Sequence, residues 1–165
     1  MARYLGFLLA AGAALASPSL PAATLTVDIH GGADYADIQS AIDAAQAGDT
    51  VLVKPGEYVI AEPINFNRDR SLLGRGARDP DDPLSPPVKN IIVRSEAGPE
   101  LTTIRMSSVP ADPGRASVVV FEHGENENSV LEGFTLTGGK GTVIDEHWPG
   151  SAGGGILCRG GHPHR

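Results

Sequence analysis

The densest group of side chains that could do chemistry is Asp145, Glu146, His147 and Trp148, which places two carboxylates, an imidazole and the only Trp in one segment. Sugar-processing sites combine carboxylates, which transfer protons, with an aromatic face on which a sugar ring packs. Neighbouring side chains on a strand point to opposite sides, so the four groups converge only in a loop. A solvated loop without a catalytic role is the simpler interpretation. Asp145, Glu146 and His147 are the catalytic candidates that this sequence offers.

A second polar segment, 122–128 (EHGENEN), carries several oxygen ligands at short spacing and could hold a cation. It lacks the Asp-X-Asp-X-Asp-Gly order of a calcium loop, so we interpret it as a polar turn between Val120 and Val130. His162 and His164 alone would make a poor metal site. The sequence therefore identifies no cofactor, and it leaves calcium open as a ligand.

The first residues predict export. Arg3 precedes an apolar stretch, Tyr4 to Ala16, that ends in small residues, which is the pattern of a secretory signal peptide spanning residues 1–16. The alternative cleavage site lies as late as Ala23. The stretch is shorter than the roughly 20 residues that a spanning helix needs, so we expect no membrane span. The predicted location is secreted, periplasmic or on the cell surface.

The net charge of the chain limits the classes of partner that we expect. The chain of 165 residues has a formal net charge of −7 and its basic residues are scattered, which disfavours nucleic acid and anionic membranes as partners. Acidity also opposes a direct grip on an acidic polysaccharide such as pectin, although calcium can bridge two acidic chains. Cys158 is the only cysteine, so no intrachain disulfide forms, and we expect it to be a buried small hydrophobe.

The elements that must position these groups begin with a helix. Residues 34–49 place apolar side chains at i, i+3, i+4 and i+7 from Ile38, which predicts a short helix with one apolar face. Asp34 is a candidate cap for its first turn, and Gly48 supplies a left-handed residue after it. Residues 50–53 then read as a strand that Pro55 ends in a turn.

The rest of the chain reads as short strands. Apolar runs rich in Val, Ile, Thr or Phe are ended by turn residues and are centred near Leu52, Ile64, Leu72, Ile92, Ile104, Val119, Phe134 and Ile156. Periodicity alone permits a β-sandwich or a solenoid. An early helix that could cover an open core, 5% aromatic residues with 21 glycines, and the recurrence of an apolar run followed by Gly-Gly favour the solenoid. Residues 74–87 contain four prolines and predict a loop insertion.

Four segments carry a family resemblance: IQSAIDAAQAGDTVLVKPGEY, NIIVRSEAGPELTTIRM, SVLEGFTLTGG and GGGILC. Together they resemble the N-terminal part of secreted right-handed parallel β-helix proteins of the pectate-lyase-like superfold, across residues 24–158. The resemblance implies an all-β, right-handed parallel β-helix (solenoid) with a short N-terminal capping α-helix. Lyases of that superfold use a basic residue with calcium-holding aspartates, and its hydrolases use paired aspartates. No segment here matches either motif, so no catalytic residue is carried over.

The resemblance also predicts a partial domain. The segment GGGILC looks like the start of a further coil, after which residues 159–165 form a polar tail, so we expect a fragment of a longer β-helix. An uncapped C-terminal end would favour self-association. The function expected is a non-catalytic protein that interacts with polysaccharide. The alternatives are a polysaccharide lyase or glycoside hydrolase, and a structural or adhesive extracellular module.

Overall fold

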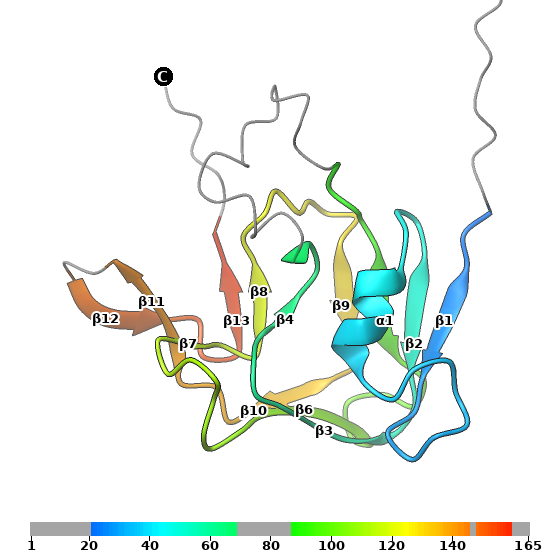
Figure 1. Cartoon of the computed structure of the whole chain (residues 1–165), viewed down its shortest axis with the longest axis horizontal. Coiled ribbons are helices and arrows are strands. Elements are labelled where there is room, and N and C mark those ends of the chain that lie inside the picture. The colour runs from blue at the N-terminus through cyan, green and yellow to red at the C-terminus, as the bar shows by residue number, and fades with distance from the viewer. Residues whose placement is uncertain (1–20, 69–86, 146–147, 160–165) are drawn as a thin grey trace, which may run out of the picture.

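The computed structural model describes residues 21–68, 87–145 and 148–159. The predicted signal peptide, the apolar run at Leu72, almost all of the 74–87 loop and residues 160–165 lie outside them. In the described part the fold is predominantly β, with three all-parallel sheets, one small antiparallel sheet and one short helix (Figure 1). The all-β class predicted from the sequence is confirmed at this level.

The three parallel sheets are built from strands far apart in the sequence. Sheet A consists, in spatial order, of β1 (Thr24–Val27), β2 (Thr50–Val53), β5 (Ile92–Ser95) and β9 (Val130–Glu132). Sheet B consists of β3 (Gly56–Ile60), β6 (Thr102–Met106) and β10 (Thr135–Thr137). Sheet C consists of β4 (Ile64–Asn65), β8 (Val119–Phe121) and β13 (Ile156–Cys158).

The chain visits these sheets in the same order three times. The first pass is β2, β3 and β4, the second is β5, β6 and β8, and the third is β9, β10 and β13. Strands of successive passes pair in parallel and in register, as in Val51 with Val93 and Val93 with Leu131. Two parallel strands of one sheet must be joined by a long connection. Here the chain makes that connection by running through the other two sheets. The parallel sheets are therefore stacked pass upon pass.

Apolar side chains in matching positions fill the space between the sheets. Sheet A contributes Val51 and Val93, and sheet B contributes Tyr58 and Ile104, all fully or almost fully buried. Because the register repeats, each buried side chain packs on its counterpart in the next pass, and the core is a set of aliphatic ladders. The low aromatic content of the sequence agrees with this packing.

Helix α1 (Ile38–Ala44) covers the core at the first pass. Its buried residues Ile38, Ala41 and Ile42 belong to the core, and the helix contacts β1, β2 and β4. The helix is shorter than predicted, and the predicted cap is wrong. Asp37 accepts the hydrogen bond from the Ser40 amide, whereas Asp34 accepts from the amide and hydroxyl of Thr26.

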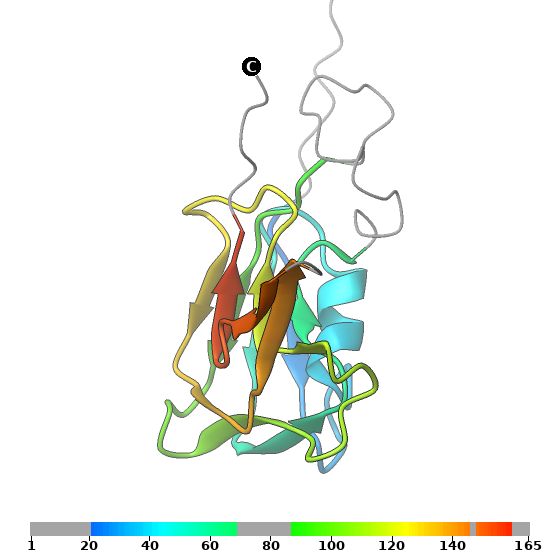
Figure 2. The same cartoon turned by 90° about the vertical axis from the view of Figure 1, so that its left-hand side faces the viewer.

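The sequence analysis did not predict all of the strands. The chain turns at Pro55 as expected, but β3 begins at once after it and carries Tyr58 into the core. Three further strands, β7 (Arg115–Ala116), β11 (Gly141–Asp145) and β12 (Trp148–Ala152), form the antiparallel sheet D. Sheet D stands outside sheet C (Figure 2). Cys158 is exposed, so the expectation that it is buried was wrong.

Candidate functional site

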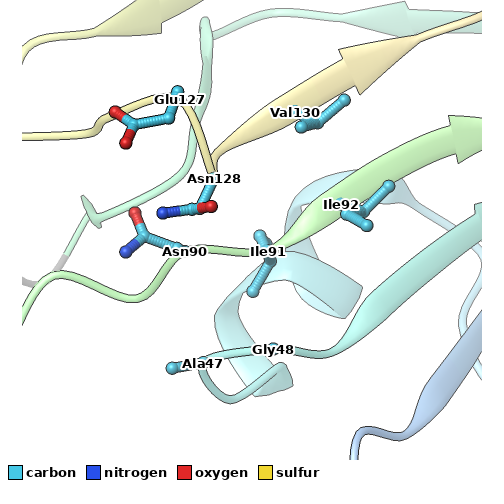
Figure 3. Close-up of a pocket in the computed structure, with 8 residues that line it drawn as sticks. All are labelled: Ala47, Gly48, Asn90, Ile91, Ile92, Glu127, Asn128 and Val130. Atoms are coloured by element: carbon cyan, nitrogen blue, oxygen red, sulfur yellow. The ribbon is translucent and has the colours of Figure 1, made fainter.

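An open groove lies where the chain turns into sheet A. Its volume is about 550 Å³, within the usual range of ligand sites, and it is lined by Ala47, Gly48, Asn90, Ile91, Ile92, Glu127, Asn128 and Val130 (Figure 3). The lining comes from three short segments that lead into β2, β5 and β9, and Ile92 and Val130 are the first residues of β5 and β9. The groove therefore crosses all three passes.

Backbone hydrogen bonds fix the three segments against one another. The amide of Gly48 donates to the carbonyl of Asn90 at 2.8 Å, and the amide of Val130 donates to the carbonyl of Ile91 at 3.0 Å. Gly48 has φ +92°, a left-handed conformation that glycine adopts without strain. These hydrogen bonds continue the parallel pairing of sheet A beyond the strand ends and hold the three segments side by side.

The register makes three lining residues equivalent. Thr50 pairs with Ile92 and Ile92 pairs with Val130, so two residues earlier Gly48, Asn90 and Asn128 occupy the same place in successive passes. The side chains of Asn90 and Asn128 lie next to each other at one end of the groove, with Glu127 beside them (Figure 3).

Local hydrogen bonds orient the polar rim. The hydroxyl of Ser129 donates to Oδ1 of Asn90 at 2.9 Å, and the amide of Asn128 donates to Oδ1 of Asn126 at 2.9 Å. Glu127 and Asn128 are exposed, so their side chains face water and can exchange it for a ligand. The half-buried side chains of Ile92 and Val130 add an apolar surface.

The groove has the chemistry of a binding site for a hydroxyl-rich ligand. Amide groups both donate and accept hydrogen bonds, and an ionised carboxylate accepts two or more. Aliphatic side chains can pack against the apolar face of a ring. Glu127 is the one charged residue among the eight that line the groove, so paired groups for acid and base catalysis do not meet there.

The predicted catalytic cluster lies elsewhere. Asp145 ends β11 and is paired with Trp148 at the start of β12, in the hairpin of sheet D. Glu146 and His147 lie outside the described residues. Figure 1 shows this hairpin on the opposite side of the molecule from β1 and β2, so Asp145 is not brought to the groove.

The polar segment 122–128 is divided between structural roles. Glu122 is buried and forms an ion pair with Arg115 of β7. Glu125 accepts hydrogen bonds from Nδ2 of Asn67 at 2.9 Å and from the amide of His123 at 2.7 Å. Within residues 21–68, 87–145 and 148–159, no three His, Cys, Asp or Glu side chains gather as a metal site.

The sequence contained a signal for the groove that composition alone did not reveal. Asn90 and Asn128 each stand two residues before a strand, in NIIV and NSVL. Neither residue type marks a site by itself, and only the register of the passes makes the two positions neighbours. Reasoning from local density of reactive groups therefore selected Asp145 and overlooked the two asparagines.

Comparison with known proteins gave no family assignment: no protein-family model matches the chain, and no solved structure matches it. The only helix of the described residues, α1, is too short to cross a membrane, and no spanning helix is found among them.

Proposed function

We propose that this chain is an exported right-handed parallel β-helix domain that binds polysaccharide, without catalysing its cleavage, in the groove beside Asn90 and Asn128. The fold part of the proposal is supported by three in-register passes through the same three parallel sheets, with α1 packed on one end. This order supports a solenoid, in which each pass contacts only its neighbours.

One observation carries the binding proposal: equivalent positions of three successive passes line one groove. Neighbouring strands lie about 4.8 Å apart, so the groove repeats its backbone at that spacing along the stack. A linear polymer of similar units can then meet the same kind of contact from pass to pass. Stacked repeat proteins bind extended ligands along their long surfaces.

The charge of the groove selects among polysaccharides. Its one charged lining residue, Glu127, is acidic, and the chain has a net charge of −7. A uronate polymer would be repelled, whereas a neutral polymer offers hydroxyl groups that donate to the carboxylate and exchange hydrogen bonds with the amides. The preferred ligand class is a neutral glycan, and an acidic one would bind only with calcium as a bridge.

Calorimetric titration with soluble neutral glucan, mannan and galactan, and with pectin and alginate in calcium or EDTA, tests the proposal. A neutral polymer is expected to bind, and Asn128→Ala or Glu127→Gln is expected to raise its Kd about 3- to 10-fold for each hydrogen bond lost. The matched control is Glu100→Gln, an exposed glutamate in the turn that precedes β6, which should leave Kd unchanged.

Flat titrations for every polymer would overturn the binding proposal and favour a structural or adhesive module. Equal losses for Glu127→Gln and Glu100→Gln would place the ligand outside the groove. Release of oligosaccharides from any of the polymers, abolished by Asp145→Asn, would replace the proposal by the lyase or hydrolase alternative.

Export belongs to the same proposal. The chain expressed in a secreting host should accumulate outside the cytoplasm, and N-terminal sequencing of the exported product should begin after Ala16 or as late as after Ala23. Cytoplasmic retention of a folded product that still begins at Met1 would contradict export.

A further inference from the structure

The two ends of the stack differ. At the first pass α1 covers the core, with Ile38, Ala41 and Ile42 buried. At the third pass the strands β9, β10 and β13 are the last of their sheets, and no described residue pairs with their far edges. Figure 2 shows β9 and β13 on the side of the molecule away from α1. We call this surface, residues 129–140 and 153–159, the open end.

Exposure along one ladder shows that the core reaches solvent there. Ile64, Val119 and Ile156 occupy matching positions in the three passes, and their exposed fractions are 1%, 0% and 44%. Leu131 and Leu136, the third-pass counterparts of fully or nearly fully buried side chains, are only partly buried. The open end is a cross-section of the core whose next layer is missing among the described residues.

Apart from their short length of three residues each, the open edges carry few of the devices that usually protect a strand from pairing. Neither β9, β10 nor β13 contains proline or lysine. Their one charged residue, Glu132, is already engaged with Arg94 at 3.3 Å in the neighbouring strand. Such edges are templates for pairing with another chain.

We propose that the open end pairs with the open end of a second copy of this chain. Charge favours this occupant, because the open end holds only Glu132, Lys140 and Arg159, a net charge of +1 in a chain of net charge −7. Two copies that meet there keep their strongly acidic remaining surfaces apart and so avoid the repulsion between them. Size favours it too, since the open end presents about 20 residues, the number that a standard interface of about 800 Å² per partner takes.

A twofold axis gives this contact a closed geometry. With the axis crossing the middle of β9, that strand lies antiparallel to β9 of the second copy, and β10 of each copy faces β13 of the other. All three open edges are then covered in one interface. The product is a dimer, because the other end of each copy is closed by α1.

Light scattering coupled to size-exclusion chromatography, over a wide range of concentrations of the exported chain, measures the dimer. The test variant is Ile156→Lys, which places a charge in the interface and should weaken dimerisation by about 100-fold or more. The matched control is Val59→Lys on β3, the edge strand of sheet B at the other end, where the exposed fraction is 51% against 44% for Ile156. This control should dimerise as the wild type does.

A wild type that stays monomeric at every concentration would overturn the proposal, as would equal weakening by both lysines. Assemblies that keep growing with concentration would overturn the twofold geometry. Should Ile156→Lys fail to fold by circular dichroism, hydrogen exchange of the wild type decides. Amides of β9, β10 and β13 should gain protection only at concentrations where the dimer forms, and protection already complete in the dilute monomer would mean that the chain covers its own end.

Discussion

A single added methyl group at Gly139 is expected to separate the third pass from the second. An alanine Cβ there would overlap the carbonyl oxygen of Gly154, and it would lie 2.7 Å from the carbonyl carbon of Gly154 and 3.0 Å from Cγ2 of Val118. None of these atoms sits at the end of a flexible side chain, since two are backbone and Val118 is fully buried. Glycine in such a place marks a close approach of two backbones.

The cost follows from what the displaced carbonyl does. The carbonyl of Gly154 accepts the amide of Val118 at 3.1 Å, next to the bond from the amide of Val119 to the carbonyl of Gly155 at 3.0 Å. Overpacking costs about 1–3 kcal/mol, and a buried amide left without its acceptor costs about 1–3 kcal/mol more. We therefore expect Gly139→Ala to lower the free energy of unfolding by about 4 kcal/mol, and Tm by about 15 °C.

Urea and thermal unfolding followed by circular dichroism measure this, with Gly155→Ala as the matched control. Gly155 is two residues before Leu157, its φ is not positive, and an added Cβ there meets nothing within 4 Å. The control should unfold within about 1 kcal/mol of the wild type. A Gly139→Ala protein as stable as Gly155→Ala would refute the close approach of the two glycines, and with it the seating of β13 on β8.

Three further substitutions test the capped end and the acid sensitivity of the fold. Ile42→Ala in α1, fully buried, should cost about 2–5 kcal/mol in urea unfolding, whereas the same change at Ile29, which is 41% exposed, should cost well under half of that. Asp49→Ala should cost about 1–3 kcal/mol because its carboxylate accepts two backbone amides, and a urea midpoint equal to that of the wild type would contradict this role. Backbone hydrogen bonding from Thr26 lowers the pKa of Asp34 from 3.8, so the folded state gains stability above that pH and loses it as the pH falls through the lowered value. Asp34→Asn should therefore lose less stability than the wild type between neutral pH and pH 3, and identical pH profiles would show that Asp34 has no part in it.

The periodic parts of the fold could be predicted from the sequence. The helix face at Ile38, Ala41 and Ile42 and the runs at Leu52, Ile92 and Ile104 follow local patterns that the structure keeps. The helix cap could not be assigned by position alone, because Asp34 and Asp37 are both capping residues and the choice depends on where β1 passes. Asp34 accepts a hydrogen bond from Thr26 of that strand, and Asp37 caps α1 instead.

The candidate site was less accessible to sequence reasoning. The clustering of reactive side chains in consecutive positions pointed to Asp145. The groove is instead assembled from residues about 40 positions apart, which only the strand register brings together. Sheet D was not predicted from the sequence, for a related reason. Its strands β11 and β12 interrupt the third pass between β10 and β13, and they pair antiparallel with each other and with β7 rather than with the three parallel sheets. Local patterns cannot distinguish an inserted hairpin from one more pass.

The groove and the open end share the third pass, and this links the two proposals. Glu127 and Asn128 line the groove at the start of β9, and β9 is also the edge that would pair with a second copy. An antiparallel β9 pair would join the two A sheets and place one groove at each end of the paired strands, on the same face. Such a dimer would bind a long polymer at two sites, and the second contact would raise the apparent affinity without any new interaction. Ile156→Lys should then weaken binding to an immobilised neutral polysaccharide by about 10-fold or more, and leave the Kd for a short soluble oligosaccharide of the same sugar unchanged. Equal weakening for both ligands would mean that the substitution disturbs the groove itself, and no weakening for either would mean that one groove acts alone.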